Sequence, residues 1–193
     1  MPAGGGRHRI ELGPPLPPET TGERELLDVW LAGYADPEPA RAALCAALPP
    51  GLEAVNVEDI GERLPSLSAS VRWAEYELAF PAAAAPALRE HVAAFLARQE
   101  LPWEERRGER MRRIDLRAAV LALEVPPGAA GDACARLRVR ITLEPGRGAR
   151  PASVLAALGV EALAMPGTLV RTAIEAARPR VALRAWRTRG RFE

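Results

Sequence analysis

The amino-acid sequence predicts an α+β fold: a ferredoxin-like βαββαβ core followed by an additional β-rich extension that contains a βαβ unit. Three observations support this prediction. Short segments alternate apolar and polar residues, longer segments carry apolar residues three or four positions apart, and Pro- and Gly-rich breaks separate them. Of the 193 residues, 48% are hydrophobic and 26% are charged. This composition is typical of a globular protein with its own core.

The first half of the chain is expected to consist of a Pro- and Gly-rich segment, residues 1–24, and a βαββαβ lobe, residues 25–106. Within residues 1–24, positions 9–12 have the pattern of a short strand. Leu27, Val29 and Leu31 alternate with other residues and predict a strand. Asp36 and Pro37 are typical of a helix start, and the helix should end at residues 49–51, Pro-Pro-Gly. The other elements expected in this lobe are strands over residues 52–60, 70–80 and 101–106 and a helix over residues 86–98.

The second half is expected to form another α+β lobe, residues 107–177, packed on the first. Its expected elements are one or two strands within residues 110–125, a strand over 135–143, a helix that begins at Pro151 and a last strand over 168–176. Residues 178–193 form a basic tail that also contains aromatic residues.

The residue types exclude several classes of enzyme. All 26 basic residues are arginine, so a Schiff-base lysine, a lysine general base and a Walker-type lysine are all absent. The candidate metal ligands His8, His91, Cys45 and Cys134 do not have the spacing of a ligand pair, and three cysteines for an iron–sulfur cluster are lacking. No serine lies in a G-x-S-x-G turn. We therefore expect no metal and no cofactor, and catalysis by this chain is not expected.

The sequence also bears on location. The first residues contain no apolar stretch of the kind found in signal peptides, and no apolar run approaches the roughly 18 residues that span a bilayer. Two widely separated cysteines do not indicate a disulfide framework. We expect a cytoplasmic protein that makes no membrane contact.

The arrangement of the arginines is the most informative feature of the sequence. Arg136, Arg138 and Arg140 alternate with apolar residues, so one face of the expected strand carries three positive charges in a row. Such a row requires either carboxylates opposite it or an anionic ligand. Arginine suits the second role because its planar guanidinium binds phosphate and stacks on bases. Further candidates for binding a polyanion are Arg147 and Arg150 before the helix at Pro151, and Arg187, Arg189 and Trp186 in the tail.

Two aspartates lie among apolar residues in expected strands, Asp28 and Asp115. A buried aspartate needs a partner, or its pKa rises. A structural ion pair with an arginine is the favoured interpretation, and a catalytic acid or base is the alternative.

Several stretches together resemble a bacterial domain of unknown function known as the radical S-adenosylmethionine-linked (radical SAM-linked) protein. The resemblance runs from about residue 9 to residue 175. The matching pieces are residues 9–17, 25–29, 47–52, 65–70, 74–76, 114–117, 150–151 with 154–155, and 171–172. It implies a partner of a radical SAM enzyme, or a domain fused to one, with a link to RNA metabolism as an extension. Members of that family begin with an additional strand and helix ahead of the Gly-Pro-Pro-Leu-Pro loop, and this sequence starts almost at that loop.

These observations predict a non-catalytic accessory or substrate-recognition module, linked to a radical SAM enzyme, that binds RNA through arginine-rich faces. Two alternatives stay open. One is a protein-interaction domain without nucleic acid, and the other is a stand-alone enzyme that uses Asp28 or Asp115. The sequence does not predict the oligomeric state.

Overall fold

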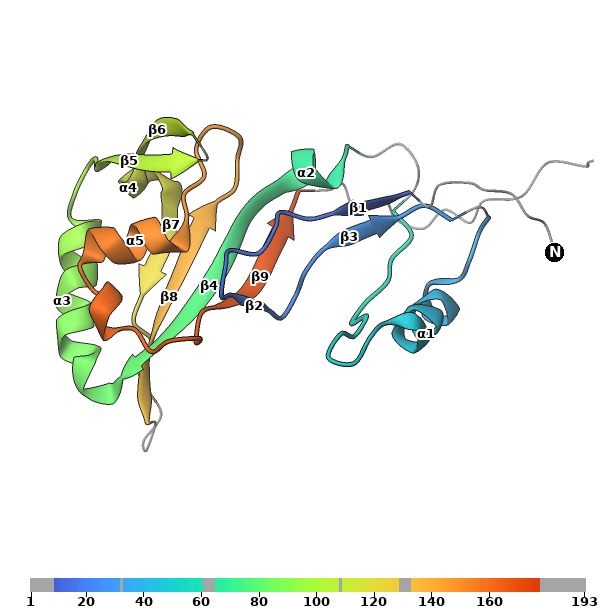
Figure 1. Ribbon diagram of the computed structural model, residues 1–193, viewed down its shortest axis with the longest axis horizontal. Helices are drawn as coiled ribbons and strands as arrows, with labels where there is room; N and C mark the ends of the chain where they lie inside the picture. The colour runs from blue at the N-terminus through green and yellow to red at the C-terminus, as the bar shows by residue number, and fades with distance from the viewer. Residues whose placement is uncertain (1–8, 32, 61–64, 108, 129–132, 178–193) are drawn as a thin grey trace, which may run out of the picture.

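The computed structural model describes residues 9–31, 33–60, 65–107, 109–128 and 133–177. Its centre is a five-stranded sheet with the strand order β2-β9-β4-β8-β7 (Figure 1). These strands are β2 (Thr21–Gly22), β4 (Val71–Pro81), β7 (Val120–Glu124), β8 (Cys134–Thr142) and β9 (Val170–Ala176). Strand β2 pairs with β9 in parallel, and the other neighbours are antiparallel.

The helices and a second pair of strands lie around this sheet. Helix α3 (Ala85–Leu96) follows the short helix η1 (Ala82–Ala84), and α5 (Pro151–Leu158) precedes η2 (Glu161–Leu163). Strands β5 (Pro102–Arg107) and β6 (Arg110–Asp115) form a separate antiparallel hairpin, which the short helix α4 (Leu116–Ala119) connects to β7. The α+β class predicted from the sequence is confirmed.

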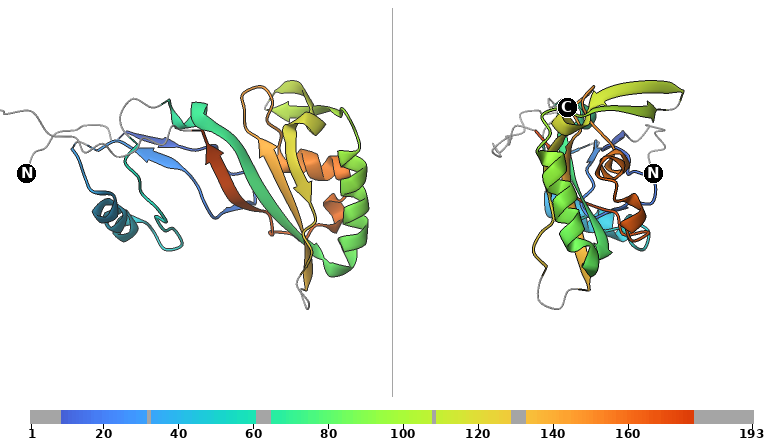
Figure 2. Two further views of the ribbon diagram at one scale, coloured as in Figure 1. Left: turned by 180° about the vertical axis from the view of Figure 1, so that it is seen from behind. Right: turned by 90° about the vertical axis from the view of Figure 1, so that its left-hand side faces the viewer.

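The alternating pattern of β4 explains the core. Ala74, Tyr76, Leu78 and Phe80 point to one face and are buried. Helices α3 and α5 cover this face with apolar side chains that belong to the same core cluster. The opposite face of β4 and β8 is open in the view from behind (Figure 2, left), where no helix of the described part of the chain lies over it.

The central sheet contains strands from both of the lobes that the sequence predicts. The sequence pattern places β4 in the first expected lobe and β8 and β9 in the second, but β4 lies between β8 and β9 and pairs with both. Residues 25–106 and 107–177 therefore share one sheet and one core. The expected strand over residues 101–106 does not join this sheet, because β5 pairs with β6 instead.

The N-terminal elements lie at one end of the molecule, away from α3 and α5 (Figure 1). Strands β1 (Ile10–Leu12) and β3 (Leu27–Val29) form a two-stranded antiparallel sheet. Helix α1 (Pro37–Ala47) follows, and α2 (Leu67–Ser70) leads into β4. Asp36 is the residue before α1, but its side chain makes no capping hydrogen bond and instead accepts one from the Tyr34 hydroxyl (2.9 Å).

The strand expected over residues 52–60 is not formed. These residues have the apolar pattern of a strand, but a strand exists only where a neighbour accepts and donates its backbone hydrogen bonds. The Ala54 carbonyl is instead within 3.5 Å of the Arg41 Nη1 on α1. The expectation was wrong because the pattern was present and the pairing partner was not.

Candidate functional site

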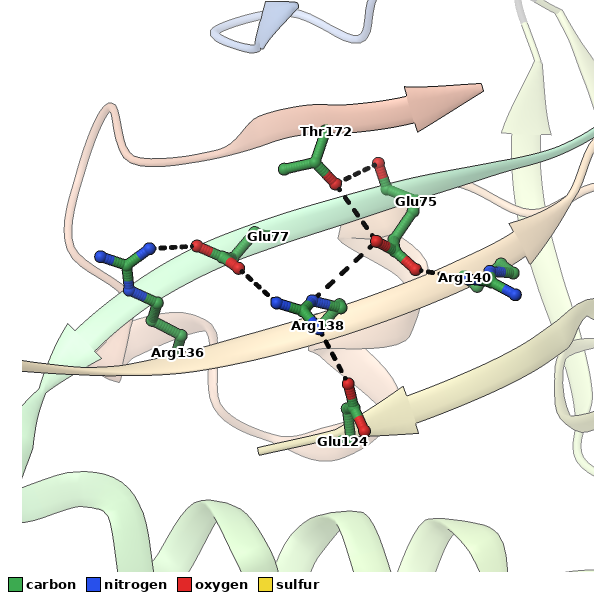
Figure 3. A network of polar contacts seen from close by, with 7 residues as sticks. All are labelled: Glu75, Glu77, Glu124, Arg136, Arg138, Arg140 and Thr172. Carbon is green, nitrogen blue, oxygen red and sulfur yellow. Dashed lines mark hydrogen bonds and ion pairs between the residues drawn. The ribbon is translucent and has the colours of Figure 1, made fainter. Parts of the chain in front are cut away.

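Glutamates of β4 face arginines of β8 across the open side of the sheet (Figure 3). The antiparallel register places Glu75 opposite Arg140 and Glu77 opposite Arg138, with Arg136 one pair further along. The Arg140 Nη2 lies 2.9 Å from Glu75 Oε2, and the Arg136 Nη1 lies 2.7 Å from Glu77 Oε1. The contact with Glu77 raises the pKa of Arg136.

Arg138 connects the pairs into one network. Its guanidinium lies 3.3 Å from Glu77, 3.9 Å from Glu75 and, on the other side, 3.2 Å from Glu124 of β7. The Thr172 hydroxyl of β9 lies 3.5 Å from Glu75. We call Glu75, Glu77, Glu124, Arg136, Arg138 and Arg140 the glutamate–arginine ladder. It carries three positive and three negative charges, so the row of arginines predicted from the sequence is neutralised by carboxylates.

The exposed fractions show which charges reach solvent. The side chains of Glu75 and Glu77 are each 17% exposed, whereas those of the three arginines are 39–55% exposed. The guanidinium groups therefore extend beyond the two glutamates of β4 toward solvent. Ion pairs as exposed as these contribute only about 0–1 kcal/mol each to stability. Their donors stay accessible to an anion that approaches from solvent.

An aromatic residue adjoins this ladder. The Arg140 guanidinium lies 4.1 Å from the centre of the Trp73 ring, a cation–π contact. The Arg140 Nε is buried, and no described residue accepts a hydrogen bond from it. Trp73 also lines a surface hollow of about 250 Å³ together with Arg72, Leu121, Thr142 and Arg147; Ala118 and Glu144 complete its wall. The structure thus brings a tryptophan and further arginines to the end of the ladder.

The other arginines predicted as polyanion ligands are placed differently. Arg147 lines the hollow and contacts Glu144 (3.4 Å). Arg150 is exposed and directly precedes α5, and it does not line the hollow. Arg187, Arg189 and Trp186 lie outside the described residues. Of the predicted polyanion ligands, Arg136, Arg138, Arg140 and Arg147 lie on or beside one face.

Asp115 has a structural role. Its Oδ1 accepts hydrogen bonds from the backbone N–H groups of Leu101 (3.0 Å), Arg117 (3.0 Å) and Ala118 (3.3 Å). The bond from Leu101, together with those from Ala118 and Arg117, lowers the pKa of Asp115. The carboxylate caps α4 and ties this helix to the residue before β5. A general acid would require the opposite shift.

Asp28 lies on β3, opposite Glu11 of β1. It is half-buried and belongs to the N-terminal sheet, whereas Asp115 follows β6. The two aspartates are therefore not brought to the ladder face.

The structure contains a buried arginine that the sequence analysis did not select as a site residue. Arg171 of β9 is 1% exposed, and its Nε lies 2.8 Å from Glu25 Oε1. Its Nη2 also contacts Glu25 and donates to the Pro14 carbonyl (2.8 Å). Burial raises the pKa of the adjacent Tyr76, and the Arg171 guanidinium opposes that rise. The sequence showed only an arginine in an apolar strand, because the partners lie about 150 positions away.

The described residues contain no cluster of three or more His, Cys, Asp or Glu side chains arranged to hold a metal ion. Among the same residues, no helix is both long and apolar enough to cross a membrane.

Fold and site together define an α+β protein with one sheet face covered by helices and the other carrying a neutral network of glutamates and arginines. The chain belongs to the family DUF2344, described as an uncharacterized protein conserved in bacteria, and the match covers residues 6–151. No curated protein and no solved structure gives a significant match to the chain.

Proposed function

We propose that this protein binds single-stranded RNA on the open face of its sheet, as a non-catalytic recognition module for a radical SAM enzyme. The observation that carries the proposal is the layer of guanidinium groups of Arg136, Arg138 and Arg140, which reach further into solvent than the β4 glutamates beneath them. The link to a radical SAM enzyme rests on the sequence resemblance described above.

The position of these groups supports the proposal. Strands β4 and β8 lie side by side near the middle of the sheet, with no helix of the described chain over their outer face. Small four-stranded sheets in other proteins bind RNA on such faces, where aromatic side chains stack on bases. Trp73 offers an aromatic ring on β4, and Arg72 and Arg147 offer positive charge beside it. Arginine can contact a phosphate through donors that its glutamate partner leaves unused.

We also infer that the fold is ferredoxin-like, over residues 71–176 rather than 25–106. With the β5–β6 hairpin and the short helices η1, α4 and η2 set aside, the order of elements is β4-α3-β7-β8-α5-β9, which is βαββαβ. Their order in the sheet, β9-β4-β8-β7, places the first and third of these strands in the middle. This arrangement supports the assignment.

The neutrality of the ladder sets the expected strength of binding. An RNA phosphate has to compete with Glu75 and Glu77 for the arginines, so we expect modest affinity and strong sensitivity to salt. Single strands release about 0.7 counterions per phosphate contact. Three contacts therefore contribute roughly 2 to the slope of log affinity against log salt concentration.

The test is fluorescence anisotropy of a labelled single-stranded RNA with the full chain and a triple variant, Arg136→Gln, Arg138→Gln and Arg140→Gln. The control replaces three arginines outside the ladder, Arg41, Arg98 and Arg113, by Gln, which gives the same change in net charge. We expect the ladder variant to lose most of its RNA affinity, and its slope of log affinity against log salt concentration to decrease by roughly 2. The control should keep the affinity and the slope of the unmodified protein. Binding that is absent in the unmodified protein, or equal in the two variants, would refute the proposal.

The zero net charge of the ladder favours a second candidate, a protein-interaction domain that does not bind nucleic acid. In that case the ladder only stabilises the sheet face. Association with a radical SAM enzyme that survives nuclease treatment, together with no RNA binding, would select this alternative.

A further inference from the structure

The N-terminal two-stranded sheet presents an apolar face to solvent. Ile10 pairs with Val29 and Leu12 pairs with Leu27, so these four side chains lie on one side of β1 and β3. Ile10 is 55% exposed and Val29 39%, whereas Leu12 is 71% exposed and Leu27 51%. We call Ile10, Leu12, Leu27 and Val29 the N-terminal apolar face.

This face does not belong to the core. The buried hydrophobic residues of the described chain begin at Leu67, and α1 buries none of its residues. Isolated two-stranded sheets are marginally stable in water, and contiguous exposed apolar side chains mark a surface that another segment covers. Tyr34, Leu52 and Val55 are also exposed in the same part of the chain. A segment that covers the N-terminal apolar face would remove the exposed area of its four apolar side chains from water.

The net charge of the stretch of chain that contains this face restricts what the covering segment can be. Residues 9–60 contain ten acidic residues and three arginines, a net charge of −7. A second copy of the same region would bring an equal negative charge to the contact, which opposes pairing. A basic segment with apolar side chains is the complementary occupant.

The C-terminal tail of the same chain has this chemistry. Residues 178–193 contain six arginines and one glutamate, a net charge of +5, with Val181 and Leu183 two positions apart. In an extended segment these two side chains lie on one face.

The tail also begins in the right place. The Ala177 backbone N–H donates to the Ser70 carbonyl (2.8 Å), so the described chain ends beside α2. Two residues earlier on α2, the Ser68 backbone N–H and hydroxyl both donate to Glu11 of β1, over 3.0 and 2.9 Å. Leu183 is six residues beyond Ala177, a reach of about 20 Å when extended, whereas a three-residue strand is only about 10 Å long.

We infer that residues 178–193 dock on the N-terminal apolar face, with Val181 and Leu183 against the apolar side chains and the arginines near acidic residues of the 9–60 stretch. The contact is intramolecular, so its effective concentration is in the millimolar range and a weak contact suffices. This inference does not depend on RNA binding by the ladder.

Hydrogen–deuterium exchange of the full chain tests the inference, with the backbone amides of residues 10–31 as the readout. The variant is Val181→Ser with Leu183→Ser, and the matched control is Ala182→Ser with Ala185→Ser. We expect exchange in residues 10–31 to become roughly tenfold faster in the variant, because two apolar contacts are lost, and to be unchanged in the control. Salt raised from about 50 to about 500 mM should accelerate the same amides in the unmodified chain. Exchange in β4 and β8 should stay constant and so report an intact core.

Equal exchange of residues 10–31 in the unmodified chain, the variant and the control at low salt would overturn the inference. Protection that rises with protein concentration, accompanied by a dimer in sedimentation, would overturn it in favour of a second copy. Protection that appears only when a partner protein is added would overturn it in favour of that protein.

Discussion

Glu25→Ala removes the carboxylate that contacts the buried Arg171 guanidinium and leaves the positive charge in place. Arg171 is 1% exposed, so water cannot easily replace the lost partner. Removal of one member of a buried ion pair costs about 3–5 kcal/mol. The Glu25 side chain is itself 37% exposed, and Arg171 keeps its bonds to the Pro14 and Pro15 carbonyls. We therefore expect a loss at the lower end, about 3 kcal/mol of unfolding free energy.

Thermal and urea unfolding followed by circular dichroism measure this loss. In a chain of this length 1 kcal/mol shifts the melting temperature by about 2–4 °C, so Glu25→Ala should lower it by roughly 6–12 °C. Glu23→Ala is the control, since it removes the same charge two residues earlier. Its backbone N–H, which donates to the Arg171 carbonyl (3.0 Å), is retained.

A Glu25→Ala variant as stable as Glu23→Ala would refute this reasoning. A second test is the double variant Glu25→Met and Arg171→Met. Replacement of a buried pair by apolar residues is often neutral, so the double variant should be more stable than Glu25→Ala alone.

The remaining predictions concern the capping aspartate, the core and the ladder. Asp115→Ala should cost about 1–2 kcal/mol in urea unfolding, because three backbone N–H groups lose their acceptor. The pKa of Asp115 is lowered in the folded protein, so the ionised carboxylate stabilises the fold above the unfolded pKa, and this stabilisation is lost as the pH falls through the folded pKa. Asp115→Asn should therefore reduce the loss of unfolding free energy on the acid side of a plot of stability against pH. An unchanged plot would contradict the capping role. Phe80→Ala should lower the free energy of unfolding by about 3–5 kcal/mol because Phe80 is fully buried. Tyr34→Ala should lower it by less than about 1 kcal/mol because Tyr34 is 75% exposed. Similar losses in the two variants would show that the core extends into the N-terminal region. Glu77→Gln removes two exposed ion pairs, so it should lower the melting temperature by less than about 8 °C. It should strengthen RNA binding in anisotropy because it frees Arg136 and Arg138, and weaker binding would count against the proposed face.

Local sequence patterns were sufficient for the long elements of the main sheet, but not for β2, which lies in the expected Pro- and Gly-rich segment. The alternation from Ala74 to Phe80 and from Leu137 to Ile141 predicted β4 and β8, and helical periodicity predicted α3 and α5. These patterns are local, because they depend only on which side of a strand or helix a residue lies. The same rule correctly placed Arg136, Arg138 and Arg140 on one face of one strand.

Only the tertiary structure decided which strands are neighbours. The pattern of residues 52–60 predicted a strand that has no partner, and β4 was separated in the prediction from the two strands with which it pairs. The charge balance of the ladder follows from this pairing, because Glu77 and Arg136 are 59 positions apart and meet only when β4 lies beside β8.

The sequence by itself therefore determined the class of fold, the absence of lysine chemistry and the row of arginines. The tertiary structure decided that this row is neutralised, that Asp115 caps a helix and that Arg171 is buried against a glutamate 146 positions away. The physical reason is the distance along the chain over which each effect acts. Periodicity and propensity act over a few residues, whereas the energy of a charge depends on burial and on partners that the folding of distant segments brings together.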